Sequence, residues 1–375
     1  MSYRVNFMLL LATIGMLSAC KKEGEIQLKE VDKTYSWTEV KQLFGLSKVV
    51  LGTAKDAGSL YLQTPGLLGR VSPGAANRRY FENVSLVGWL PYDVNVKVPI
   101  AANLYAWPAG DTIIVVTPMA EPSSSQYSDY IHLRKLDPQA STVYNTTVRS
   151  STAGDYQVGA INQNDYLLVA YRRTTTGPAD PPMRLMLAHV TKNSFRGLKA
   201  QAQVLSFPAI PVTTSFPYVY RIVAIDDYFL VGHSERGIYK VKQDGSIRLV
   251  SNQTGYWTIY KYQGKIYAYT SDGNNSVLIS TDEGETWTKF SGIPSYFLSS
   301  SMHVIGDSLV GYVRPFNQLY TLRWNNATGK VRELKNDGLR ETSITGIELL
   351  RDTVYIGTTS GLFKRPLKNF FESKP

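Results

Sequence analysis

The side chains best suited to recognise a ligand are aromatic rings and arginines that recur near the ends of predicted strands. Rings stack on flat ligand surfaces, and guanidinium groups orient polar or anionic substituents. The same rings could instead pack as core between strands, and the sequence leaves both interpretations open. The candidate ligand-binding residues are Tyr218, Tyr220, Arg221, Arg236, Tyr256, Trp257, Tyr296 and Arg314.

Metal, nucleophile and cofactor chemistry have little support in this sequence. The four histidines are far apart and lack the spacing of metal ligands: His132, His189, His233 and His303. No G-x-S-x-G turn, P-loop or dinucleotide fingerprint is present. We therefore predict no catalytic residue, no cofactor and no resident metal. A calcium ion held by loop carboxylates is left as an alternative.

The charge pattern limits the choice of partners. The formal net charge is +10, but no basic run is longer than two residues, as in Lys21-Lys22 or Arg172-Arg173. Nucleic-acid binding needs a basic stripe or patch, so we predict that nucleic acid is not a partner. Affinity for anionic glycans or lipid headgroups is left as an alternative.

The N-terminal residues have the pattern of a targeting segment. Arg4 is followed by an apolar stretch from Phe7 to Met16 that is too short to span a bilayer comfortably. The motif Leu17-Ser18-Ala19-Cys20 resembles the lipobox of bacterial lipoproteins, and Cys20 is the single cysteine of the chain. This resemblance implies a signal peptide over residues 1–19, and a lipidated N-terminus and tether over 20–34. Lys21 after the cysteine favours the outer membrane, on its periplasmic or cell-surface side.

A unit of short strands recurs along the rest of the chain. In most of these units a tight polar turn precedes the most apolar strand. The last four units are spaced about 40 residues apart, which is typical of propeller blades. We predict an all-β, seven-bladed β-propeller over residues 35–375; six or eight blades stay open because residues 66–98 are hard to parse. The most apolar strands of the units are expected at 49–53, 113–117, 166–170, 228–232, 265–269, 309–312 and 354–358.

The ends of the chain predict how the ring closes. The last unit has three strands, from Ser343 to Leu367, and lacks a fourth. A strand near Tyr35-Ser36-Trp37 would supply it, which removes the open sheet edges that promote aggregation.

One polar octet carries a second resemblance. Ser280, Asp282, Gly284, Thr286 and Trp287 match every fixed position of S-x-D-x-G-x-T-W. This motif is similar to the Asp box of BNR and sialidase-like propellers, where it is a structural turn between the outer strands of a blade. We expect Asp282 to accept hydrogen bonds from its own turn and Trp287 to close over it.

The same resemblance raises the question of glycosidase activity. Sialidases use an arginine triad, a Tyr–Glu nucleophile pair and an Asp acid/base. Their early Arg-Ile-Pro motif is absent, because Arg70-Val71-Ser72-Pro73 does not match it, and one clear Asp box is present instead of several.

The leading hypothesis is therefore a non-catalytic binding propeller, attached to the membrane by its lipid, that recognises a glycan, peptide or partner protein. The alternatives are a sialidase-like glycoside hydrolase and a structural assembly factor for an envelope complex. An acidic pair beside clustered arginines would favour the hydrolase. A channel mouth lined by rings and amides would favour binding.

The lipobox generates the first testable prediction. Replacing Cys20 by Ser removes the thiol that would carry the lipid, so the variant should move from the membrane to the soluble fraction. Fractionation and incorporation of labelled fatty acid measure the effect. Continued incorporation into Cys20→Ser would show that the lipid is attached elsewhere.

Overall fold

The computed structural model describes residues 36–41, 48–50, 52–55, 58–64, 67–73, 78–81, 105–109, 112–119, 130–143, 159–174, 183–192, 198–208, 219–234, 236–254, 256–270, 275–291, 300–313, 318–325, 328–339 and 343–374. These residues belong to one compact unit, Ser36–Pro375. Cys20 and the predicted signal peptide and tether lie outside the described residues. No helix in the described part is long and apolar enough to cross a membrane.

Six antiparallel sheets with the four-strand order of a propeller blade are present among the described residues. Each is named below by its first and last strands. In chain order they are β2 (Gly52–Lys55), β3 (Leu60–Thr64), β4 (Leu67–Val71), β5 (Arg78–Phe81); β10 (Gly159–Ile161), β11 (Tyr166–Arg173), β12 (Met183–Lys192), β13 (Leu198–Leu205); β14 (Val219–Ile225), β15 (Tyr228–His233), β16 (Gly237–Val241), β17 (Ile247–Ser251); β18 (Tyr256–Tyr262), β19 (Lys265–Thr270), β20 (Ser276–Ser280), β21 (Thr288–Ser291); β22 (Ser300–Ile305), β23 (Ser308–Val313), β24 (Gln318–Asn325), β25 (Thr328–Glu333); and β26 (Ile344–Leu350), β27 (Thr353–Thr358), β28 (Gly361–Pro366), β1 (Thr38–Glu39).

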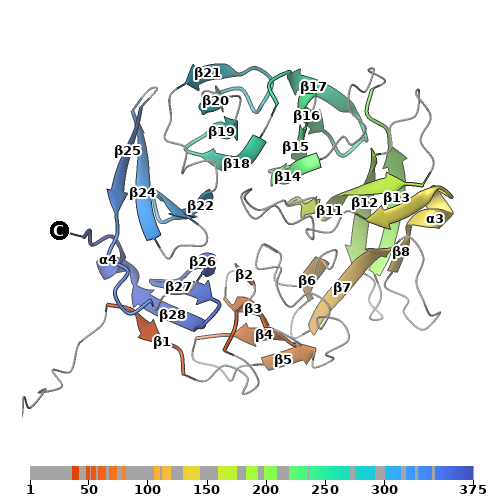
Figure 1. Cartoon of the computed structure of the whole chain (residues 1–375). Helices are drawn as coiled ribbons and strands as arrows, with labels where there is room; N and C mark the ends of the chain where they lie inside the picture. The colour runs from red at the N-terminus through yellow and green to blue at the C-terminus, as the bar shows by residue number, and fades with distance from the viewer. Residues whose placement is uncertain are drawn as a thin grey trace, which may run out of the picture. The chain divides into compact units, whose positions relative to one another are not determined.

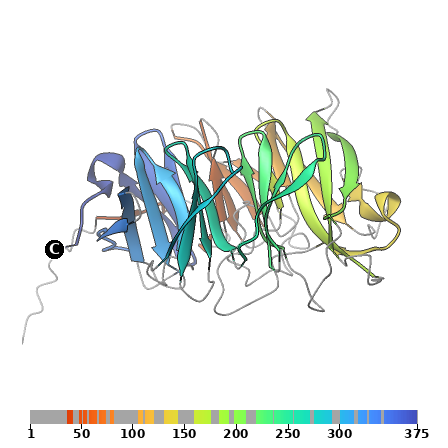
Figure 2. The same cartoon turned by 90° about the horizontal axis from the view of Figure 1, so that it is seen from above.

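The blades stand around a common axis with their first strands innermost (Figure 1). Innermost strands of neighbouring blades contact each other in the order β10, β14, β18, β22, β26, β2. Figure 2 shows the same strands from the side. The predicted propeller arrangement is thus confirmed with six blades.

A seventh sheet does not have blade order in the described residues. It contains β6 (Tyr105–Ala109), β7 (Thr112–Met119) and β8 (Tyr130–His132), and β8 pairs with β7 in parallel. The short helix α3 (Leu133–Leu136) and strand β9 (Ala140–Val143) follow, and β9 pairs with β11 beyond the end of β10. Leu133 begins α3, so strand β8 ends at His132.

Burial explains why the second strand of a blade is its most apolar strand in the sequence. All residues of β15 are buried, whereas the outermost strand β17 is mostly exposed or half-buried. A strand covered on both faces reads as a continuous apolar run. The prediction for the first unit is wrong: Val49 and Val50 lie before innermost strand β2, which begins at Gly52, and the second strand is β3.

The tight turns before the second strands follow the predicted chemistry. Asp226, Gln263 and Arg351 have positive φ angles of 48°, 48° and 55°. Two-residue hairpin turns need such left-handed residues, because their twist matches that of the flanking strands. Polar residues at these positions therefore shape the first hairpin of three blades, β14–β17, β18–β21 and β26–β28 with β1.

The expected closure by the N-terminal strand is confirmed. Strand β1 pairs antiparallel with β28, where Thr38 lies opposite Lys364, and so completes the last blade. Just before it, Trp37 is 3% exposed and meets the ring of Phe370 edge-on at 5.9 Å. The observed strand begins slightly later than predicted, because Ser36 and Trp37 are held instead by Asp337 and Lys335.

The C-terminal segment fastens the last blade to the one before it. After the helix α4 (Leu367–Phe370), Ser373 forms an isolated bridge with Leu334, next to the end of β25. Lys374 pairs with Glu333 at 2.5 Å, and Arg365, 1% exposed, pairs with Glu372 at 3.0 Å. Backbone and charged contacts thus hold the chain end against the neighbouring blade.

The first and last blades meet at a seam with little free space. Thr345 donates to the carbonyl of Val50 at 2.9 Å, and the amide of Val50 donates to Thr358 at 2.9 Å. A Cβ added to Gly346 would lie 2.1 Å from the Thr53 hydroxyl oxygen. The seam therefore needs a residue without a side chain at position 346.

This seam generates a stability prediction. Gly346→Ala should destabilise the fold by about 1–3 kcal/mol, because overpacking forces buried atoms apart. Thermal or denaturant unfolding measures it. Thr53→Ala removes the atom closest to the added Cβ. The loss of unfolding free energy in the double variant should therefore be smaller than the sum of the losses in the two single variants. Strict additivity would contradict the proposed contact.

Candidate functional site

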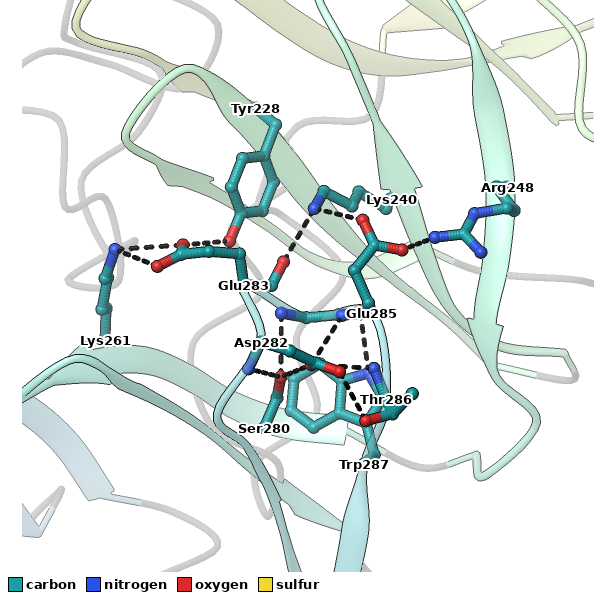
Figure 3. A network of polar contacts seen from close by, with 11 residues as sticks. Tyr228, Lys240, Arg248, Lys261, Ser280, Asp282, Glu283, Glu285, Thr286 and Trp287 are labelled. Carbon is teal, nitrogen blue, oxygen red and sulfur yellow. Dashed lines mark hydrogen bonds and ion pairs between the residues drawn. The ribbon is translucent and has the colours of Figure 1, made fainter.

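The turn 280–287, between β20 and β21, is closed by its own polar groups (Figure 3). Asp282 Oδ1 accepts from the Thr286 amide at 2.9 Å, and Oδ2 accepts from the Thr286 hydroxyl at 2.6 Å. The Ser280 hydroxyl donates to Asp282 and accepts from the Gly284 amide, both at 2.8 Å. Gly284 has φ +81°, which favours glycine, and its carbonyl accepts from Trp287 Nε1 at 3.1 Å. The Thr286 hydrogen bonds lower the pKa of Asp282 to about 2.

Lys240, on β16 of the neighbouring β14–β17 blade, is fixed by this turn. Its Nζ donates to the Glu283 carbonyl at 2.8 Å and to Glu285 Oε1 at 2.7 Å. The same nitrogen lies 4.1 Å from the centre of the Tyr228 ring, and Glu285 also pairs with Arg248. The Lys240 side chain is only 7% exposed, and burial lowers its pKa. A buried ammonium needs such partners, because an unpaired one would be strongly destabilising.

A second set of contacts involves Lys261 on β18. Its Nζ lies 2.5 Å from Asp226 Oδ2 and 3.0 Å from Glu283 Oε1. The hydrogen bond to Asp226 is the main cause that raises the pKa of Lys261. Tyr228 donates to Glu283 Oε2 at 3.0 Å; burial and this bond raise the Tyr228 pKa. Together with the Lys240 contacts, these bonds form an inter-blade latch between the β14–β17 and β18–β21 blades.

An apolar cluster lies beside the latch. Trp287 packs against a core that includes Tyr228, Leu230 and Ile266, which come from both blades. A cleft of about 460 Å³ opens at the same place. Its lining residues are Asp226, Asp227, Tyr228, Lys240, Lys242, Gln243, Asp244 and Glu283. Three of these charges pair with residues outside the lining, Asp226 and Glu283 with Lys261 and Lys240 with Glu285, and these pairs support packing between blades.

The predicted ligand-binding residues are only partly described. Tyr218, Tyr296 and Arg314 lie outside the described residues. Tyr220, Tyr256 and Trp257 were expected in loops between blades, and this is corrected: they belong to innermost strands β14 and β18. These strands include the three residues because pairing with β15 and β19 extends to the first residue of each strand.

The two described arginines of this set are buried. Arg221 is 3% exposed and Arg236 is 7% exposed, and Arg236 donates to the Pro208 carbonyl at 2.7 Å. His233 lies close to them, and burial followed by the charge of Arg236 lowers its pKa to about 4. His233 is therefore neutral at physiological pH, and the two arginines supply positive charge within this blade.

Three innermost strands share an irregularity that the sequence does not reveal. The register shifts between Val219 and Arg221, between Tyr256 and Thr258, and between Ile344 and Gly346. In each case the second residue of the strand is extra. Such β-bulges re-aim side chains and are enriched next to functional sites. We call them the strand-start bulges; their extra residues are Tyr220, Trp257 and Thr345.

One carboxyl on an innermost strand has a strongly shifted pKa. Burial raises the pKa of Glu348 to about 7, although Lys55 and the Thr53 hydroxyl lower it. A shifted group of this kind is a candidate for function. One such carboxyl does not make the pair of carboxylates that glycoside hydrolysis usually requires. Within the described residues, no group of three or more His, Cys, Asp or Glu side chains could hold a metal ion.

No protein-family model and no curated protein matches this chain. Among solved structures, it is similar to the extracellular domain of the putative one-component system BT4673 from B. thetaiotaomicron, with TM-score 0.49 and 12% identity over 92% of this chain and 44% of that one. PorZ, a surface component of the type-IX secretion system of Porphyromonas gingivalis, gives TM-score 0.46 and 11% identity over 91% and 39%. BamB from Moraxella catarrhalis gives 0.40 and 11% over 84% and 82%. This chain spans less than half of the first two, and at these TM-scores the likenesses carry no argument about function.

The Asp282 contacts predict a pH dependence of stability. A carboxyl whose pKa is lowered by folding contributes stability above its unfolded pKa, and loses it as the pH falls through the folded pKa. The difference in melting temperature between the wild type and Asp282→Asn should therefore be constant above about pH 5 and shrink between about pH 4 and 2. Asp244→Asn is a comparison variant, because Asp244 lies in an exposed turn where hydrogen bonds from Ser246 lower the carboxyl pKa. A difference that grows on acidification would contradict the hydrogen bonding described.

Proposed function

We propose that this chain is a non-catalytic binding propeller, held at the outer membrane by a lipid on Cys20. In this proposal residues 1–19 are a lipoprotein signal peptide, 20–34 the lipidated N-terminus and tether, and 35–375 the propeller. The ligand is a glycan, a peptide or a partner protein. It binds at the end of the ring where the innermost strands begin, on the periplasmic or cell-surface side of the membrane.

The proposed position of the binding site rests on the strand-start bulges. All three interrupt the beginning of an innermost strand, so they lie at the same end of the ring. Two of the extra residues are the aromatic Tyr220 and Trp257. A bulge costs ladder hydrogen bonds, and its repetition at one end favours a role at that end. Tyr218, Tyr296 and Arg314 are proposed to join the site from neighbouring loops.

Two finer features of the fold belong to the same proposal. The turn 280–287 is an Asp box of the kind found in sialidase-like propellers, and its role is structural; its closed hydrogen-bond pattern supports this. A seventh blade is built on β6 and β7, which pair antiparallel like the first two strands of the other blades. An experimental structure with four antiparallel strands between Phe81 and Ala140 would support seven blades.

The binding prediction concerns Trp257. A glycan array and a peptide array, probed with the purified protein, identify the ligand class. Trp257→Ala should then weaken binding by about 0.5–2 kcal/mol, the range for lost ring contacts, with little change in melting temperature. Trp287→Ala is the matched control, because it removes a tryptophan from the opposite end of the blade: it should lower the melting temperature and leave affinity unchanged.

Two outcomes would overturn the proposal. Equal affinity of the wild type and Trp257→Ala for the identified ligand would place the site elsewhere. Hydrolysis of fluorogenic sialosides or other glycosides by the purified protein would show that the propeller is an enzyme.

A further inference from the structure

The hairpin β24–β25 carries three exposed cations on one face. Arg323 lies directly opposite Lys330, and Thr321 lies opposite Arg332. Opposite residues of an antiparallel pair share a face, and so do residues two apart in a strand. Arg323, Lys330 and Arg332 are all exposed and form what we call the basic face.

The basic face is not neutralised by the described part of the chain. None of its three cations has an ion-pair partner there, and Arg332 donates to the Phe371 carbonyl at 3.1 Å. Nearby acids are already paired: Glu333 with Lys374 and Glu372 with Arg365. Like charges directly opposite each other destabilise a sheet, so an external anion on this face would relieve their repulsion.

The N-terminal segment joins the ring next to this hairpin. The Ser36 amide donates to Asp337 Oδ2 at 2.9 Å, and Asp337 follows closely after Glu333, the last residue of β25. From Cys20 to Ser36 an extended chain reaches at most roughly 55 Å. A lipid on Cys20 would therefore leave the basic face within reach of the headgroups of the membrane.

We propose that the basic face docks on the anionic lipid headgroups of the membrane that holds the protein. This rests on the proposed lipid at Cys20. Arginine forks bind phosphate oxygens with two parallel hydrogen bonds, and clustered cations are attracted to anionic leaflets. Docking gives the ring a defined orientation, with the β22–β25 blade toward the bilayer, and leaves the strand-start bulges free to bind a ligand.

Lysine labelling of the protein on vesicles tests this inference. The protein is reconstituted into vesicles of phosphatidylcholine, with or without phosphatidylglycerol, and treated with an amine-reactive reagent. Mass spectrometry should show Lys330 labelled severalfold more slowly on phosphatidylglycerol vesicles, and the protection should be lost at high salt. Exposed Lys265, on β19, should react equally on both.

Variants separate docking from general charge attraction. Arg323→Gln with Arg332→Gln should abolish the protection of Lys330. Lys135→Gln with Lys242→Gln removes two exposed charges, from helix α3 and from the turn after β16, and should leave the protection intact. Equal loss in both variants would overturn the inference, as would protection of Lys330 by soluble polyglutamate or duplex DNA on phosphatidylcholine vesicles.

The two proposals fail in different ways. Protein that does not float with either kind of vesicle contradicts the lipid anchor. Protein that floats with both, but whose Lys330 is equally reactive on both, contradicts docking and leaves the anchor standing.

Discussion

The meeting of the first and last blades is the constraint on which the other blades depend. A ring of sheets has buried faces only if the last blade covers the first. Here this takes a short strand from the N-terminal side, β1, and a seam in which Thr345, Val50 and Thr358 share hydrogen bonds. The seam admits no side chain at Gly346, so backbone approaches backbone where the circle ends. Ser36 and Asp337, which are joined just before β1, are 301 positions apart in the chain. Contacts of such sequence separation carry a loop-closure cost that local contacts do not have, and folds rich in them fold more slowly.

The two ends of the blades have different chemistry. At the end where first and second strands turn, the turn 280–287 binds Lys240 and Lys261 and uses its acids to hold two blades together. At the other end, β-bulges interrupt the first residues of the innermost strands in three blades. Polar groups that are fully engaged with each other stabilise but have little left for a ligand. Because of this difference we place the proposed binding site at the end of the ring away from the latch, although the cleft of about 460 Å³ lies beside the latch.

Much of the fold could be predicted because the relevant signals are local. Second strands such as β15 and β27 are buried on both faces and so appear as apolar runs, and turn residues such as Asp226 mark the hairpins. The first unit was misplaced by one strand, because an apolar connection at Val49 and Val50 imitates a buried strand. The candidate site is harder to predict from the sequence. A bulge depends on the register between two strands, and Tyr220 or Trp257 looks the same in sequence whether or not it is extra. The latch joins residues between 22 and 55 positions apart, and its weak sequence signal is the pair Glu283 and Glu285 on either side of Gly284.

The attachment of β1 also has a mechanical consequence. Any force on the N-terminal segment enters the ring through Ser36, Trp37 and a strand of two residues. Pulling β1 away would uncover the edge of β28 and the ring of Trp37 together. The contacts of Ser36 with Asp337 pass part of that force to the β22–β25 blade, so two blades resist it. The C-terminal bridge from Ser373 to Leu334 joins the same two blades. The point where the protein would be pulled is thus also the point where the first and last strands of the propeller are attached.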